Sequence, residues 1–151
     1  MLARIRRSMA EKDQGFTLIE LLVVMIIIGI LAAIAIPVFL NQRKRAVDSS
    51  IKSDLRSIAN QMETYFADNQ TYVEPAQTGG AGKPVTMTGG DPVNVSGVNE
   101  FTFVMLDKDG VVTSDAAKVT GYCITGTSDN GSDKTITYNS QAGGISSNDC
   151  T

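Results

Sequence analysis

The hydrophobic residues of this chain follow two different patterns, and the first is an unbroken apolar run. Residues 21–40, LLVVMIIIGILAAIAIPVFL, include no charged or strongly polar side chain. A helix of this length spans about 30 Å, which matches the hydrocarbon core of a membrane. No water reaches backbone groups in that core, so a single spanning segment must be helical. The pattern therefore predicts a membrane-spanning helix over residues 16–40.

Beyond Leu40 the apolar positions become periodic. They step by four and three residues, as on one face of an α-helix, at Ile51, Leu55, Ile58, Met62 and Tyr65. The charged residues of this stretch fall off that stripe, where solvent is expected: Asp48, Lys52, Asp54 and Arg56. We expect an amphipathic continuation of the helix over residues 41–68. The pair Asp68-Asn69 is its predicted stop, because Asn69 can adopt the left-handed cap conformation.

The remaining residues, 69–151, indicate a small globular head. Glycine and proline interrupt residues 71–97, a connection with short β-type pieces at 85–88 and 93–95. Strand patterns follow, at residues 101–106, 117–125 and 135–138. Residues 107–110, Asp-Lys-Asp-Gly, carry a hairpin-turn signature. The sequence predicts an α+β fold, with a long N-terminal helix packed against an antiparallel sheet of three or four strands.

Composition argues against several classes of function. From Glu63 onward the chain has four lysines, eleven acidic residues and no arginine, a poor surface for phosphate backbones. With no histidine and two cysteines, zinc and copper sites are not expected. The acidic turns at 107–110 and 128–133 could bind calcium through carboxylate oxygens, but neither has the spacing of a twelve-residue calcium loop, so solvated turns are the favoured interpretation. No nucleophile motif or phosphate loop is present, so we predict no enzyme, no cofactor, no metal site and no nucleic-acid site.

The start of the apolar run resembles a known family. The stretch GFTLIELLVVMIIIGILAAIAIP, from Gly15 to Pro37, resembles the N-terminus of type IV prepilins and of type II secretion pseudopilins. The resemblance is specific over residues 14–45 and continues more weakly to Tyr72. It implies that a prepilin peptidase removes residues 1–15 as a leader by cutting after Gly15. It also implies that the new N-terminal amine, on Phe16, is then methylated.

Three further residues acquire roles from this resemblance. Glu20, fifth in the implied mature chain, would meet the Phe16 amine of a neighbouring subunit and set the register of assembly, since a buried charge pair fits at one stagger only. The alternative is that Glu20 stays hydrated at the membrane interface. Gly29 and Pro37 lower helix stability and would let the helix stretch in a fibre. Alternatively, they are the residues that membrane helices commonly tolerate.

Cys123 and Cys150 both lie after the apolar segment. In an exported small domain, an even number of cysteines favours a disulfide over two separate buried thiols. The pair would close a loop of about 28 residues and add roughly 3–4 kcal/mol of stability. It also resembles the disulfide-bounded loop of many pilins. Basic residues flank both ends of the apolar run, so the positive-inside rule does not fix the orientation. The cysteines and the resemblance place the head outside.

The function that these observations predict is that of a structural subunit. The favoured hypothesis is a type IV pilin that assembles with itself into a helical extracellular filament, after a stage as a single-pass membrane protein. Its implied partners are the prepilin peptidase, an assembly platform, a motor ATPase and the cytoplasmic membrane. The alternatives are a pseudopilin of type II secretion, a competence-type pilus, or an enzyme or receptor held by a signal anchor. Adhesion, motility, DNA uptake and secretion all remain compatible with the sequence.

Overall fold

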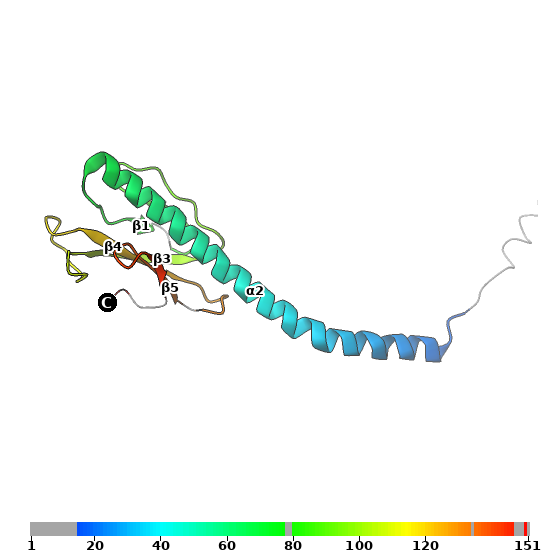
Figure 1. Ribbon diagram of the computed structural model, residues 1–151. Helices are drawn as coiled ribbons and strands as arrows, with labels where there is room; N and C mark the ends of the chain where they lie inside the picture. The colour runs from blue at the N-terminus through cyan, green and yellow to red at the C-terminus, as the bar shows by residue number, and fades with distance from the viewer. Residues whose placement is uncertain (1–14, 78–79, 134, 147–149, 151) are drawn as a thin grey trace, which may run out of the picture. The chain divides into compact units, whose positions relative to one another are not determined.

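The computed structural model describes residues 15–77, 80–133, 135–146 and 150 (Figure 1). One helix, α2 (Leu18–Asn69), runs through 52 residues and is continuous at Gly29 and Pro37. The chain divides into two compact units, residues up to Leu40 and residues 41–151. The predicted leader, residues 1–15, lies outside the described residues except for Gly15.

The first unit is the apolar part of α2. Its large hydrophobic side chains, from Phe16 to Leu40, are exposed, and no residue of its most apolar 18-residue segment is buried. The mean hydropathy of that segment is 3.1, so α2 is long and apolar enough here to cross a membrane. An apolar surface of this extent needs a lipid or protein environment. The helix predicted over residues 16–40 is therefore present from Leu18 onward.

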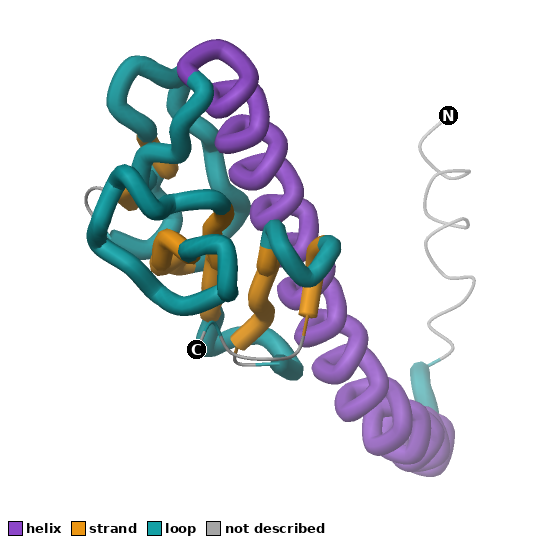
Figure 2. The backbone as a smooth tube through the Cα atoms, turned by 60° about the vertical axis from the view of Figure 1, so that its left-hand side comes forward, coloured by secondary structure: helices purple, strands orange, loops and turns teal. Residues whose placement is uncertain are grey.

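The second unit contains two antiparallel sheets beside the C-terminal half of α2 (Figures 1 and 2). The larger sheet has the strand order β3-β4-β5-β6, which confirms the predicted antiparallel sheet. Its strands are β3 (Glu100–Leu106), β4 (Gly121–Thr127), β5 (Thr135–Asn139) and β6 (Gly144–Ser146). The smaller sheet pairs β1 (Ala76–Gln77) with β2 (Val85–Thr86). This is an α+β arrangement.

The core lies between α2 and the four-stranded sheet. The predicted stripe is confirmed, because Ile51, Leu55, Ile58 and Met62 are at most 1% exposed. They pack in one cluster with residues of β3, β4 and β5. Helix and sheet approach each other closely at Gly126 of β4, since a Cβ there would lie 2.7 Å from Ile51 Cγ2. Only glycine lets the strand come so near.

The four-stranded sheet differs locally from what the sequence predicts. The strand predicted from residue 117 begins at Gly121, because Asp115 closes a turn by accepting a hydrogen bond from the Ala117 N–H and pairing with Lys118. The turn at 107–110 forms, but it leads to a single bridge, Leu106 with Val112, and β4 pairs on the other side of β3. Strand β6 was not predicted; its short Gly-Ile-Ser sequence carries little strand signal.

The helix ends one residue later than predicted. Asn69 is still helical, and Gln70 takes the left-handed conformation with φ 57°. The Gln70 N–H donates to Phe66 O at 2.7 Å, and the Asn69 side chain donates to Tyr65 O at 3.0 Å. Both residues thus satisfy carbonyls that the helix end leaves free. The expectation that Asn69 would be the left-handed residue was wrong.

Candidate functional site

The first candidate site is the start of α2. The Glu20 carboxylate accepts hydrogen bonds from the Thr17 N–H at 2.9 Å and the Thr17 hydroxyl at 2.7 Å. In return, the Glu20 N–H lies 3.3 Å from Thr17 Oγ1. This reciprocal pair is a capping box, which satisfies donors at the beginning of a helix. Glu20 also places negative charge at the helix N-terminus, where the helix dipole favours it.

Thr17 is the residue that our reading of the sequence missed. The spacing Thr17-x-x-Glu20 is itself the signal for a capping box, so the contact could have been predicted. Before the capping box, the chain at Gly15 and Phe16 is not helical, and both residues are exposed. A Cβ at Gly15 would meet no atom of the described residues within 4 Å. Gly15 and Phe16 are therefore accessible on the described part of the chain.

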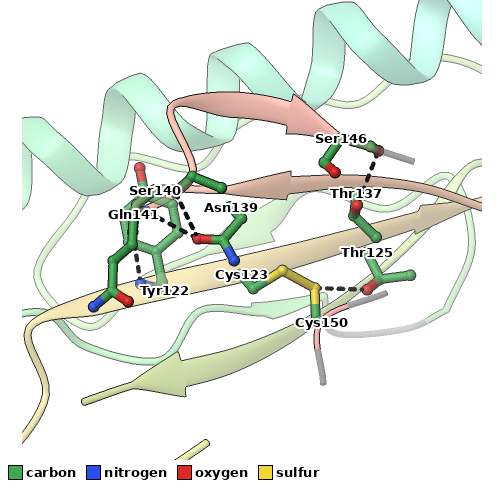
Figure 3. The surroundings of a disulfide bond; sticks show 10 residues. Tyr122, Cys123, Thr125, Thr137, Asn139, Ser140, Gln141, Ser146 and Cys150 are labelled. Carbon is green, nitrogen blue, oxygen red and sulfur yellow. Dashed lines mark hydrogen bonds between the residues drawn. A yellow bond between two sulfur atoms is a disulfide. The ribbon is translucent and has the colours of Figure 1, made fainter. Parts of the chain in front are cut away.

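The second site is the C-terminal disulfide. Cys123 of β4 is bonded to Cys150, with Cα atoms 5.7 Å apart, as the sequence predicts (Figure 3). Cys123 is 1% exposed, and its strand neighbours Tyr122 and Ile124 belong to the core that faces α2. Side chains alternate along a strand, so Cys123 points to the opposite face. The bond therefore holds the chain end against the sheet face remote from the helix, where Cys150 Sγ lies 3.2 Å from Thr125 Oγ1.

We expect Cys123→Ser to lower the free energy of unfolding by about 3 kcal/mol, because the loop closed by the disulfide is freed in the unfolded chain. Cys150→Ser should cost about as much, and the double variant no more than either, since all three remove one bond. Urea unfolding of the full chain in detergent, followed by tyrosine fluorescence, measures this. All variants should enter the membrane normally. Free thiols at both positions in the extracellular protein would contradict the pairing.

Two buried carboxylates correct an expectation from the sequence. Asp48 and Asp54 were predicted to lie in solvent, but they are only 6% and 5% exposed. They flank the apolar stripe of α2, and each carboxylate accepts hydrogen bonds from one loop of the head. Asp48 Oδ1 accepts from the N–H groups of Ser132 and Asp133, at 2.9 and 3.3 Å. The burial of these acids is possible because backbone donors from distant segments satisfy them.

Asp54 holds the connection between α2 and β3. The Ser96 N–H and hydroxyl donate to its two oxygens at 2.8 and 3.0 Å, and the Asn99 amide donates at 3.0 Å. Asn99, itself 2% exposed, also reaches the Ser50 hydroxyl at 3.2 Å. Its carbonyl accepts from the Gln77 amide at 3.1 Å. A glycine-rich stretch with little regular structure is thereby fixed to the helix by a buried polar network.

Asp54→Ala should destabilise the head by about 2–4 kcal/mol, because it leaves buried donors of Ser96 and Asn99 without an acceptor. Asp54→Asn should cost less, since one acceptor oxygen remains. The same urea titration gives both values, and Ser57→Ala, an exposed position on α2, is the matched control with an expected change below about 0.5 kcal/mol. An Asp54→Ala variant as stable as the control would show that the network adds nothing.

Tyrosines join the end of α2 to the sheet. The Tyr122 hydroxyl donates to Glu63 Oε1 at 2.9 Å, and the Tyr72 hydroxyl reaches Glu63 Oε2 at 3.2 Å. The rings of Tyr72 and Tyr122 meet edge to face, with centroids 5.2 Å apart. Burial, with the Glu63 charge beside it, raises the pKa of Tyr72 to about 12. Burial and the Glu63 hydrogen bond raise the pKa of Tyr122 as well, so both tyrosines stay neutral donors.

Metal binding finds no support in the described part of the chain, where no three His, Cys, Asp or Glu residues lie together as ligands. In the turn at 107–110, the Asp107 carboxylate accepts from the N–H groups of Val111 and Asp109, and these bonds lower its pKa. In the turn at 128–133, the N–H groups of Ser132 and Asp133 are bonded to Asp48. Both turns are organised by hydrogen bonds within the chain.

A capped apolar helix that continues into a small disulfide-bearing α+β head is a pilin-like arrangement. Comparison with protein families agrees, because residues 12–36 match the prokaryotic N-terminal methylation motif. That range includes Gly15, Phe16 and Glu20. The resemblance to prepilins that the residues suggested is thus confirmed for the N-terminal segment.

Curated relatives come from two groups of proteins. Over 61 residues the chain is 43% identical to the type IV major pilin protein PilA of Myxococcus xanthus, covering 40% of this chain and 28% of that one. It is 34% identical over 80 residues to the type II secretion system core protein G of Dickeya chrysanthemi, 52% of each chain. It is 49% identical over 59 residues to the type IV wide pilus major component PilA4 of Thermus thermophilus, covering 39% and 45%.

These matches are partial. The chain spans about half the length, or less, of the curated relatives described above. No solved structure matches the chain significantly.

Proposed function

We propose that this chain is the precursor of a filament subunit of the type IV pilus kind. The observation that carries the proposal is the methylation motif at residues 12–36, set at the start of a helix whose apolar surface is wholly exposed. Such a surface can lie in a membrane before assembly and against the helices of other subunits afterwards. Pilin relatives of Myxococcus and Thermus support the same role.

Processing is part of this proposal. A prepilin peptidase cuts after Gly15, removes residues 1–15, and methylates the Phe16 amine. The open, non-helical chain at Gly15 and Phe16 supports this step, because a peptidase needs an accessible extended segment. In the mature chain, residues 16–40 form the membrane and filament-core helix, residues 41–68 its amphipathic continuation, and residues 69–151 the globular head with the C-terminal disulfide loop. Gly29 and Pro37 provide weak points at which that helix can extend under load.

Assembly is the second part. Glu20 carries the one charged side chain between Phe16 and Leu40. It pairs with the cationic Phe16 amine of a neighbouring subunit and so sets the register, while the apolar surface supplies adhesion. The pilus platform and its motor ATPase are the machinery that such a subunit requires. The head then faces the outside of the cell, where the Cys123–Cys150 disulfide is stable.

The second candidate is a pseudopilin of a type II secretion system. The specific support is that several relatives are core protein G subunits of such systems, among them the Dickeya protein with the longest alignment described above. The disulfide-bounded C-terminus favours the pilin. A competence-type pilus is a close variant of the first candidate.

Electron microscopy of the producing cells separates these functions. A pilin predicts surface fibres that contain this chain and disappear when its gene is deleted. A pseudopilin predicts normal fibres in the deletion strain and secreted proteins retained inside the cell. If deletion changes neither fibres nor secretion, the proposal of a filament subunit is wrong.

A further inference from the structure

The exposed surface of α2 just beyond Leu40 is strongly cationic. It carries five basic residues in fourteen positions: Arg43, Lys44, Arg45, Lys52 and Arg56. The two acids of the same stretch, Asp48 and Asp54, are buried and bonded to backbone donors of the head loops. Among the described residues the ion pairs are Lys108 with Asp109 and Lys118 with Asp115, so none of these five cations has one. No ion pair with a described residue therefore neutralises their charge.

Three of the cations border a groove in the head. Arg45, Lys52 and Arg56 are seven and four residues apart, which places them on one side of the helix. Three adjoining hollows, of about 460, 480 and 370 Å³, run along this side. The first two share Lys52, and the second and third share Ile145 of β6. We call this the β6 groove; its floor is the edge of the sheet and its helix wall is basic.

The groove also includes acidic groups, which limit what it can accept. The Asp48 carboxylate lies at one end and accepts from Ser132 and Asp133. Asp133 lines the same end with an exposed side chain. Among the described residues, no acidic side chain lines the other end, which Arg56 and Asn60 border. Carboxylates from a partner are thus best accommodated toward Arg56, whereas Lys52 shares its two hollows with Asp133.

The far end of α2 has the opposite charge. After Arg56 the helix contains no further cation and two acids, Glu63 and Asp68. Glu63 is occupied by the tyrosine hydroxyls, but Asp68 is exposed and has no ion pair among the described residues. It lies in the last turn, where the helix dipole disfavours negative charge and where no basic residue is present. Glu74, exposed just beyond the helix, is a second carboxylate that has no ion pair among the described residues.

We propose that the β6 groove of one copy receives Asp68 and Glu74 of a second copy of this chain. The inference rests on the proposed function, because a filament stacks copies in parallel and offsets them along its axis. Lys52 and Arg56 precede Asp68 on the same helix by a distance of about 18–24 Å. When a neighbouring copy is displaced along the axis by that amount, Lys52 and Arg56 of one copy lie beside the acidic helix end of the other. The second copy is the favoured occupant because the chain itself carries both halves of the complementary pair.

Charge reversal within the full chain tests the contact. Lys52→Glu with Arg56→Glu should reduce sheared, pelletable fibre about tenfold or more, because like charges then face Asp68 and Glu74. Asp68→Lys with Glu74→Lys should do the same, although a cation in the last turn should favour the isolated helix. The chain with all four substitutions restores opposite charges at every contact and should recover fibre. Lys83→Glu, which reverses one exposed cation outside α2, is the control for charge reversal elsewhere on the head and should leave fibre unchanged.

Three results would overturn the proposal. The first is wild-type fibre yield from the Lys52→Glu, Arg56→Glu chain. The second is an equal loss from Lys83→Glu. The third is failure of the four-substitution chain to recover, which would assign the basic wall to another anion, such as a phosphate or an acidic polysaccharide. Disulfide formation and urea unfolding of each variant check that its head is folded. Fibre formed by the wild-type chain in the same preparations tests the filament function separately. The proposed function and the proposed contact can therefore be contradicted independently.

Discussion

A chain with Gly15→Val should fold and enter the membrane, yet remain uncut and form no fibres. The substitution does not disturb the described part of the chain, because a Cβ at Gly15 meets none of its atoms within 4 Å and the residue lies outside the helix. The effect must therefore arise in the peptidase, whose site is expected to leave no room for a side chain before the scissile bond. Mass spectrometry of the membrane fraction should find the full leader on the variant.

The wild-type chain, in contrast, should begin at Phe16 and carry one additional methyl group. Gly29→Val is the matched control, since Gly29 is also unobstructed but lies fourteen residues inside the implied mature chain. It should be cut and methylated as the wild type is. Fibres whose subunits still begin at Met1 would show that cleavage is not required and would remove the basis for the proposed function.

The elements that could be predicted from the sequence are those governed by local pattern. The apolar run requires a helix whatever surrounds it, and the stripe from Ile51 to Tyr65 fixes which face the head covers. The strands at β3 and β5 follow from β-branched and aromatic runs between turn residues. In each case neighbouring residues alone carry the information, and the rest of the chain only has to be compatible with it.

The errors occurred where distant segments decide the outcome. Asp48 and Asp54 look like solvent-facing charges on a helical wheel, and only the loops at Ser132 and Ser96 make their burial favourable. Strand β6 depends on the hairpin at Asn139, whose side chain accepts from the N–H of Gln141. Such contacts lie tens of residues apart for the two acids, so a periodicity analysis does not contain them.

The candidate sites also differ in whether neighbouring residues or distant segments form them. Gly15, Phe16 and Glu20 form a linear motif, and linear motifs are visible in a sequence. The capping box of Thr17 and Glu20 also follows from the sequence, because the Thr-x-x-Glu spacing is its signature. The β6 groove could not be predicted, because it combines a helix side with a strand edge about ninety residues further on. The basic residues that border the groove can nevertheless be recognised from their helical spacing, at Arg45, Lys52 and Arg56.

The capping box changes how a role for Glu20 must be tested. In the isolated chain the Glu20 carboxylate is already satisfied by the N–H and hydroxyl of Thr17. Loss of assembly on removing Glu20 could therefore reflect either a frayed helix start or a missing charge. The two causes can be separated, because a glutamine side chain can still accept the Thr17 hydrogen bonds while carrying no charge. Thr17→Ala makes the opposite change, removing the hydroxyl and keeping the carboxylate.

We expect Glu20→Gln and Glu20→Leu to be cut, methylated and held in the membrane, yet to yield few or no fibres. Leucine should insert more easily than glutamate, so a membrane defect is not the cause. Glu20→Asp should give intermediate yield, because the charge remains but reaches one methylene less far. Thr17→Ala should assemble nearly as the wild type does. Sheared fibre and membrane-held subunit are compared for all four chains. Full yield from Glu20→Leu, or a loss confined to Thr17→Ala, would rule out pairing with the Phe16 amine as the source of register.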